Sequence, residues 1–253
     1  MYEEMIEKLT AAALSKEGLL KKGLLRYLIL SAFAGMFVGL GIILIFTIGG
    51  TVGDSPFKKV LMGVSFGIAL SLVLMVGSEL FTGNNLIMTV GSLEKKVRWS
   101  TTLKIWLFSF FGNLVGSVFV AGLFVMTGLA TGGVGDFILK VSASKMSAPF
   151  MELFFRGILC NILVCLAVMT FIKLKEETAK LVMIFWCLFA FITSGFEHSV
   201  ANMTLLSISL MIPHSEAVSL SGFVANMLPV TLGNIVGGAV ILALGYWYVG
   251  KKA

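Results

Sequence analysis

The sequence Gly77-Ser-Glu79-Leu-Phe-Thr-Gly-Asn84 returns 118 residues later as Gly195-Phe-Glu197-His-Ser-Val-Ala-Asn202, with the shared pattern Gly-x-Glu-x-x-x-x-Asn. A second phrase, Gly112-Asn-Leu-Val-Gly116, returns 121 residues later as Gly233-Asn-Ile-Val-Gly237. The common order and the similar offsets indicate two homologous halves. Each half carries a polar phrase within apolar surroundings, and in membrane transporters such paired interruptions point to the substrate site. Glutamate and asparagine are costly at bilayer depth, which favours a functional role.

The composition around these phrases is that of an integral membrane protein. Of the 253 residues, 58% are hydrophobic and 13% are charged, and the mean hydropathy is +1.00. Soluble domains lie nearer half apolar and a quarter charged. The length leaves room for six spans of about 20 to 25 residues, so we expect no extramembrane catalytic domain. The net charge of +6 comes from residues scattered through the connections, which favours membrane topology over nucleic-acid binding.

Six apolar stretches predict an all-α membrane protein: 27–50, 59–90, 102–127, 150–173, 180–211 and 223–250. Each half has three spans, an odd number, so the repeats 27–127 and 150–250 must cross the membrane in opposite senses. We expect residues 1–253 to form one transmembrane domain, with an amphipathic surface segment at 1–26. Spans two and five exceed 30 residues and each contains a Gly-x-Glu phrase. Both are therefore predicted to be two half-helices joined by an unwound loop.

The lysines and arginines predict the orientation of the spans. Fourteen lie in the N-terminal segment, the two even-numbered connections and the C-terminus, where they are Lys251 and Lys252. Five lie in the odd-numbered connections. Because positive residues are retained on the cytoplasmic side, both termini are predicted to be cytoplasmic.

His198 is the one histidine within an apolar span. Its near-neutral pKa would let it exchange protons at physiological pH, and the alternative is a neutral histidine satisfied by hydrogen bonds. Its place at a broken span favours the functional role. Thr82 lies opposite His198 by pseudo-symmetry, in the first copy, where its hydroxyl could donate to an anion or bond back to its own helix. Two half-helix starts would aim positive dipole ends at the middle, which favours an anionic substrate.

The remaining polar residues near the phrases also have structural interpretations. Glu79 and Glu197 are expected to accept hydrogen bonds from unwound backbone or to pair with a lysine, rather than to bind an anion. Lys145, taken alone, is a solvated loop lysine. Four asparagines are expected to join helices: Asn84, Asn113, Asn202 and Asn234.

The sequence contains no pattern for catalysis or for a cofactor. It has no nucleophile–base pair with a supporting acid and no phosphate-binding GxxxxGK[ST]. No cluster of His, Cys and carboxylate residues has the spacing of a metal site. We therefore expect a protein that is not an enzyme and that binds neither a metal nor another cofactor.

The chain resembles the formate/nitrite transporter family over all six predicted spans, and five ordered motifs carry the resemblance. They are Glu79-Leu-Phe-Thr-Gly-Asn84, Gly112-Asn-Leu-Val-Gly116, Arg156-Gly-Ile-Leu-Cys-Asn161-Ile-Leu-Val-Cys-Leu166, Gly195-Phe-Glu-His-Ser-Val-Ala-Asn-Met203 and Pro229-Val-Thr-Leu-Gly-Asn-Ile-Val-Gly-Gly238. The resemblance implies an aquaporin-like protomer in a homopentamer of a bacterial inner membrane. Each protomer would carry its own pore for a small monovalent anion.

The resemblance also implies roles for individual residues. Thr82 and His198 would form a central pair, and Asn161 would line the pore. Lys145 becomes an electrostatic partner of the anion, with Glu197 and Asn202 nearby. Apolar slits would be formed by five residues that pattern alone does not distinguish from bundle core: Phe66, Leu70, Leu80, Phe81 and Phe191.

The segment Val38-Gly-Leu-Gly-Ile-Ile-Leu-Ile-Phe46 resembles the nitrite-channel branch, while formate and hydrosulfide channels share the central residues. The sequence thus predicts a channel for nitrite or a similar anion, in which His198 donates a proton so that the neutral acid crosses the slits. The alternatives are a formate or hydrosulfide channel, a proton-coupled secondary transporter and a non-transporting sensor. The expected partners are the anion, protons, the lipid bilayer and further copies of the chain, and not nucleic acid.

Overall fold

The computed structural model describes residues 2–250, and every regular element within them is a helix. Two of these elements, η1 and η2, are π-helices. Such helices are rare in proteins, and those that occur are often at functional sites. In chain order the elements are α1 (Tyr2–Lys21), α2 (Leu24–Thr51), α3 (Lys58–Ser65), α4 (Gly67–Ser71), η1 (Leu72–Gly77), α5 (Phe81–Leu93), α6 (Trp99–Met126), α7 (Gly132–Met146), α8 (Phe150–Lys173), α9 (Glu177–Ser194), α10 (Ser199–Met211), α11 (Leu220–Ile235), η2 (Val236–Ala243) and α12 (Leu244–Gly250). Lys251 and Lys252, which were counted for the orientation, lie outside the described residues.

Six helical segments are long and apolar enough to cross a membrane. They are Leu24–Thr51, Lys58–Gly77, Trp99–Met126, Phe150–Lys173, Glu177–Ser194 and Leu220–Gly250. Each begins within three residues of a start predicted from hydropathy. The predicted fold class, an all-helical membrane protein with six spans, is confirmed.

Spans two and five are both broken at the repeated phrase. Span two leaves its helix at Gly77, runs through residues 78–80 and restarts as α5. Span five leaves α9 at Gly195 and restarts as α10 after His198. The φ angles of Gly77 and Gly195 are 90° and 78°, in the left-handed region that glycine adopts without strain. This backbone requirement explains why each phrase begins with glycine.

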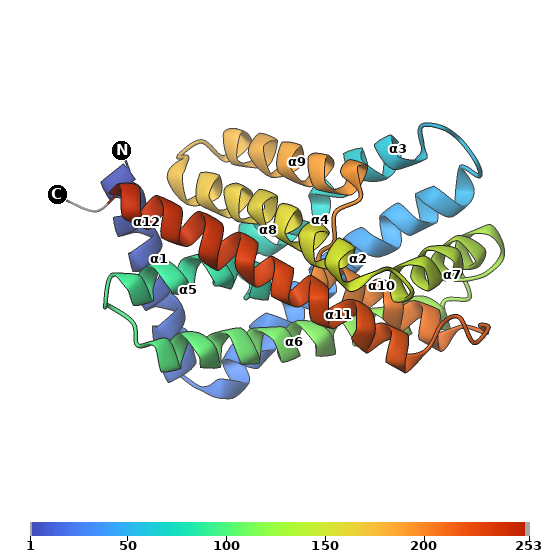
Figure 1. The fold of residues 1–253 in the computed structure, drawn as a ribbon, viewed down its shortest axis with the longest axis horizontal. Helices are drawn as coiled ribbons and strands as arrows, with labels where there is room; N and C mark the ends of the chain where they lie inside the picture. Colours follow the sequence, from blue (N-terminus) through green and yellow to red (C-terminus); the bar gives the residue numbers. More distant parts are fainter. Residues whose placement is uncertain (1, 251–253) are drawn as a thin grey trace.

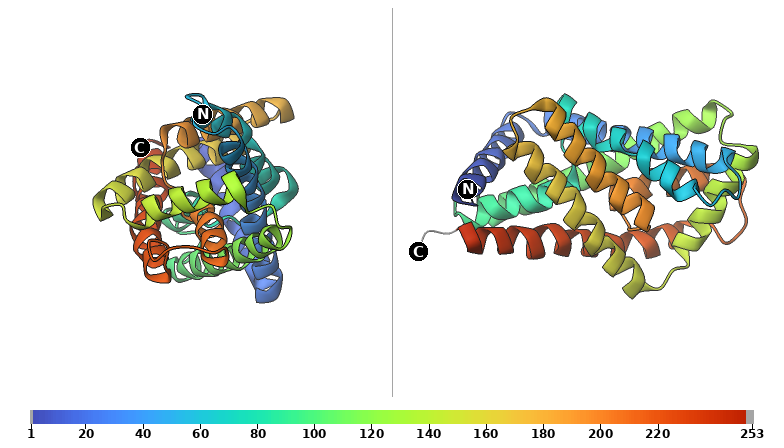
Figure 2. Two further views of the ribbon diagram at one scale, coloured as in Figure 1. Left: turned by 90° about the vertical axis from the view of Figure 1, so that its right-hand side faces the viewer. Right: turned by 90° about the horizontal axis from the view of Figure 1, so that it is seen from above.

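The half-helices that follow the two breaks, α5 and α10, run toward opposite ends of an elongated bundle. Figure 1 shows both chain ends at one end of the molecule, and α3 and α7 at the other. At the end that carries the termini, α1 packs across the bundle against α5 and α12. At the opposite end, α10 packs against α7. The turned views in Figure 2 show the same arrangement. An inverted repeat requires this opposition.

The second repeated phrase lies where long spans pack closely in pairs, α2 with α6 and α8 with α11. A methyl group built on Gly116 would collide with the backbone of Ala32. A methyl group on Gly233 would likewise collide with the backbone of Phe154. Glycine therefore permits the close approach of the two spans in each half.

The connection between spans three and four contains a helix, α7, that hydropathy did not predict because it is too short to be a span. Its residues Phe137, Val141 and Lys145 recur at helical spacing on one face. Lys145 thus lies in the last turn of a helix rather than in a solvated loop, and 19% of its side chain is exposed. The interpretation of Lys145 as a loop residue was wrong for this reason.

Candidate functional site

The two breaks bring Thr82 and His198 into contact in the middle of the bundle. Thr82 Oγ1 lies 2.9 Å from His198 Nε2, and both side chains are buried. Thr82 is in the first turn of α5, and His198 immediately precedes α10. The starts of the two half-helices therefore meet at this pair, where their dipoles favour negative charge.

The hydrogen bonds of His198 assign its protons. The backbone N–H of Ala201 donates to His198 Nδ1 at 3.1 Å, so the ring caps α10. An accepting ring nitrogen carries no proton, so the neutral ring carries its proton on Nε2 and donates to Thr82 Oγ1. A second proton could bind Nδ1 only after the N–H of Ala201 lost this acceptor.

A void of about 10 Å³ lies beside His198 with otherwise apolar walls. Four of the five predicted slit residues line it: Phe66, Leu70, Leu80 and Phe191. The rings of Phe66 and Phe191 meet edge to face, with their centroids 5.5 Å apart. A space of this size holds about one water molecule at most. An anion could therefore pass only if these side chains moved.

Asn113 on α6 holds the first break and the fifth predicted slit residue, Phe81. Its Oδ1 accepts a hydrogen bond from the N–H of Phe81 at 2.9 Å. Its Nδ2 donates to the carbonyls of Ser31 and Glu79, at 2.7 and 2.9 Å. The ring of Phe81 packs against Phe110, with centroids 5.2 Å apart, and does not line the void.

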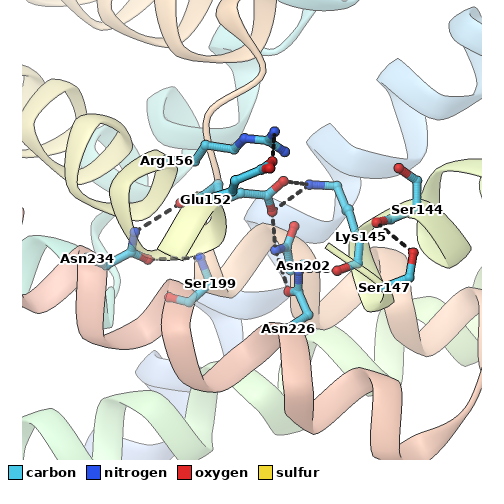
Figure 3. Close-up of polar contacts among 10 residues, drawn as sticks. Ser144, Lys145, Ser147, Glu152, Arg156, Ser199, Asn202, Asn226 and Asn234 are labelled. Carbon is cyan, nitrogen blue, oxygen red and sulfur yellow. Dashed lines mark hydrogen bonds and ion pairs between the residues drawn. The ribbon is translucent and has the colours of Figure 1, made fainter. Parts of the chain in front are cut away.

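Asn234 on α11 holds the second break in the same way. Its Oδ1 accepts from the N–H of Ser199 at 2.9 Å. Its Nδ2 donates to the carbonyls of Gly157 and Glu197, at 2.8 and 3.0 Å. Each asparagine thus satisfies the first free N–H of a half-helix and one carbonyl of the unwound segment. Figure 3 shows the bond between Asn234 and Ser199.

Lys145 pairs with Glu197 beside the second break, in a network drawn in Figure 3. Lys145 Nζ donates to both carboxylate oxygens of Glu197 at 2.6 Å. Asn202 Nδ2 also donates to Glu197 Oε2 at 2.6 Å, and to Asn226 Oδ1 at 2.8 Å. Asn226 Nδ2 donates to the backbone carbonyl of Lys145 at 3.0 Å, which closes a ring of polar contacts. Three of the predicted site residues are therefore together.

The first break has a corresponding cluster built from other elements. Lys16 Nζ on α1 donates to Glu79 Oε1 at 2.8 Å. Glu79 Oε2 accepts from the hydroxyl of Tyr27 at 2.9 Å and from Asn84 Nδ2 at 3.2 Å. A Lys–Glu–Asn cluster therefore lies beside each break, and both glutamates pair with a lysine, which is one of the two roles expected for them.

Lys16, Tyr27 and Asn226 were missed by sequence reasoning. Asn226 carried a usable signal, because an asparagine within an apolar span is costly unless it is paired. Lys16 carried none, since it lies in an amphipathic helix where lysines are common. Its contact with Glu79 depends on how α1 packs across the bundle.

Asn161 contacts the central pair through a hydrogen bond to the backbone carbonyl of Thr82. Its Nδ2 donates to the carbonyl of Asn234 at 2.6 Å, to Asn85 Oδ1 at 3.2 Å and to the carbonyl of Thr82 at 3.3 Å. Its side chain is fully buried and lines neither the void nor the vestibule described next. In this conformation Asn161 joins α8 to α5 and α11.

A vestibule of about 420 Å³ leads to His198 from the end of the bundle formed by α3 and α7. Lys145, Glu197 and Asn202 are among the residues that line it. Phe191 and His198 line both the vestibule and the central void, so these two side chains separate the spaces.

Comparisons with known proteins agree with this architecture. A family model described as formate/nitrite transporter matches residues 3–248. The chain is 46% identical to the "Nitrite transporter NirC" of Escherichia coli K12, over 100% of this chain and 94% of that protein. It is 30% identical to the "Formate channel FocA" of the same strain, over 87% of this chain and 85% of that protein.

Solved structures give the same result. An "FNT family ion channel" superposes with a TM-score of 0.93 at 45% identity, covering 97% of this chain and 98% of that one. A "Pentameric formate channel with formate bound" superposes with a TM-score of 0.81 at 29% identity, covering 92% and 99%. The chain therefore belongs to the formate/nitrite transporter family.

Proposed function

We propose that this protein is a pore for small monovalent anions and that nitrite is its substrate. The observation that carries the proposal is the buried contact of Thr82 with His198, where two half-helix starts meet beside an apolar slit. The identity of 46% with nitrite transporters along the whole chain supports nitrite. The only chemical change to the anion in this function is the gain and loss of a proton.

The vestibule supplies the first step, which is recruitment of the anion. Lys145 lies at the vestibule wall and attracts negative charge, while Glu197, which also accepts a hydrogen bond from Asn202, holds its ammonium group in place. Thr82 and His198 would then donate hydrogen bonds to the anion at the start of the slit. Bare charge does not cross an apolar slit readily, because desolvating an ion costs several kcal/mol.

His198 would remove this barrier by protonating the anion. A proton from the vestibule binds Nδ1 as the N–H of Ala201 withdraws, and the Nε2 proton passes to nitrite. The products are nitrous acid and a neutral ring that carries its proton on Nδ1. The neutral acid then crosses between Phe66 and Phe191, and the proton travels with the anion. Transport coupled to the proton gradient follows from this scheme.

Formate is the second candidate substrate. The chain is 36% identical to a "Probable formate transporter" of Methanothermobacter thermautotrophicus over 90% of its length. Formate, like nitrite, is a small monovalent anion that forms a neutral acid by taking one proton. The central pair would act on both in the same way.

The assembly and the orientation belong to the same proposal. We propose a homopentamer in a bacterial inner membrane, on the model of the related structure titled pentameric. Both termini would be cytoplasmic, because the connections on the side of the termini carry most of the lysines and arginines. The vestibule would then face the periplasm.

Uptake into proteoliposomes tests the function. Purified protein is reconstituted with a pH dye inside, and nitrite, formate or hydrosulfide is applied outside with and without a competing second anion. The proposal expects saturable nitrite entry that acidifies the interior. An anion that the pore transports poorly should compete weakly and inhibit nitrite entry least. Nitrite entry equal to that of protein-free liposomes would contradict it.

A further inference from the structure

The vestibule carries more positive charge than the recruitment of one small anion requires. Four cationic side chains line it in addition to Lys145: Lys58, Lys59, Lys140 and Arg156. Glu197 is the one carboxylate among the lining residues. These charges come from three elements, α3, α7 and α8, which face one another across the same space.

Three of these cations lack an acidic partner. Arg156 pairs with Glu152 at 2.6 Å, and Lys145 is held by Glu197. Within residues 2–250, Lys58, Lys59 and Lys140 form no ion pair. The charge of these three lysines is therefore not shared with a carboxylate.

Lys58 contacts the ring of Phe137, and Lys140 lies one turn further along the helix that carries this ring. Lys58 Nζ lies 4.6 Å from the centroid of the Phe137 ring, a cation–π contact that holds it at the wall. Lys140 follows Phe137 by three residues on α7, so both lie on the helix face that lines the vestibule. The ring of Phe137 and both lysines therefore line the same vestibule.

The volume and the other walls also exceed the needs of a small anion. The vestibule has a volume of about 420 Å³. Pockets for organic ligands have about 300–1,000 Å³, mostly apolar walls and a few charged groups. Apolar walls are supplied here by Ile42, Ile45, Phe46 and Met62.

We propose that the vestibule binds an organic dianion, with an apolar body of ring size and two acidic groups. One acidic group would lie between Lys58 and Lys140, and the other would reach toward Lys145. The body would pack on Phe46 and Phe137. Because Phe191 and His198 close the inner end, the ligand stays in the vestibule and blocks the entry of smaller anions. The blocking rests on the proposed function, whereas the binding does not.

Equilibrium binding to the purified, detergent-solubilised protein tests the site directly. The probes are naphthalenedisulfonate, naphthalenemonosulfonate and inorganic sulfate, which separate the contributions of charge and body. The disulfonate should bind most tightly of the three. Lys58→Gln and Lys140→Gln should each weaken it about fivefold and weaken the monosulfonate less. Lys58→Arg should retain binding, and Lys96→Gln, in the loop after α5, should leave it unchanged.

Flux gives the second measurement, namely inhibition of nitrite uptake by the same three probes. The concentration of disulfonate that halves uptake should rise in Lys58→Gln and Lys140→Gln in proportion to the loss of binding. Binding that is equal for the disulfonate and the monosulfonate, or equal in wild type and both Gln variants, would overturn the proposal. If the disulfonate binds as expected but nitrite does not enter, the site stands and the proposed function fails.

Discussion

The hydroxyl of Thr82 is the polar group of the first repeat that faces His198, and both are buried. Replacing Thr82 with valine keeps the shape of the side chain and removes this hydroxyl. We expect the half-saturation concentration for nitrite to rise by about 5- to 30-fold, because a lost hydrogen bond to the anion is worth about 1–2 kcal/mol. Uptake into proteoliposomes at graded nitrite concentrations measures it.

Thr82→Ser is the matched control, because it keeps the hydroxyl and removes only a methyl group. It should remain close to wild type, and both variants should elute with the same assembly size. An unchanged half-saturation concentration in Thr82→Val would count against a substrate site at Thr82.

His198 is the one ionisable residue among those that line the central void. In the scheme above, uptake rises as pH falls from about 8 to 5, because each transported anion requires a proton from the vestibule. His198→Asn keeps a hydrogen-bonding side chain that cannot exchange a proton. The variant should lose proton-linked uptake and its pH dependence, and it could retain an uncoupled leak. Nitrite flux and internal pH are recorded together across this range.

The pH profile separates the two roles of His198. If the ring serves only as the cap of α10 through Ala201, His198→Asn should preserve the pH profile and the ratio of protons to nitrite. Parallel profiles in wild type and variant would remove His198 from proton transfer.

Lys145 compensates the charge of Glu197, whose side chain is nearly inaccessible, with 4% of it exposed. Lys145→Glu would put two carboxylates together, and breaking such a buried pair costs about 3–5 kcal/mol. We expect nitrite uptake to be nearly abolished. Lys145→Arg should retain most uptake, and Lys96→Glu, at an exposed position, should change little, because surface charge is screened within about 8–10 Å at physiological salt. Equal losses in the two Glu variants would make Lys145 a generic surface charge.

At the scale of the helices, each half-helix is held by an asparagine from another span. Asn234→Ala would leave the N–H of Ser199 and the carbonyls of Gly157 and Glu197 without this partner. Unsatisfied buried groups cost about 1–3 kcal/mol each, so the midpoint of thermal unfolding should fall and nitrite uptake should be lost.

Asn113→Ala should have a similar effect, because Asn113 makes the same set of bonds at the other break. Thr51→Ala is the control, since the hydroxyl of Thr51 bonds only to the carbonyl of Thr47 on an exposed part of α2. The unfolding of all three variants is followed in one detergent. Midpoints unchanged from wild type in both asparagine variants would show that the breaks hold without them.

At the scale of the whole molecule, α6 presents a stripe of exposed apolar side chains at intervals of four residues: Leu103, Leu107, Phe111, Val115 and Phe119. Lipid or a neighbouring protomer must cover such a stripe. On the proposed assembly, native mass spectrometry of the detergent-solubilised protein should give five times the chain mass of 27.2 kDa. A single chain or a trimer under conditions that preserve uptake would contradict the pentamer.

The sequence by itself determined the number of spans, the two breaks and the inverted relation of the halves. These follow from hydropathy, from the length of spans two and five and from the repeated phrases, all of which are local properties of the chain. It also pointed to Thr82 and His198, because polar residues at bilayer depth stand out against an apolar background. The glycines of the phrases were visible because the phrases repeat, although their left-handed φ angles were not.

Only the tertiary structure decided which side chains meet. Lys16 reaches Glu79 because α1 crosses the end of the bundle, and Asn226 reaches Lys145 because α11 packs beside α7. The acceptor role of His198 Nδ1 and the unpaired lysines of the vestibule likewise depend on neighbours from distant parts of the chain. Hydropathy records how apolar each segment is. The partner of a buried polar group is selected by the direction in which packed helices present their side chains, which no single segment encodes.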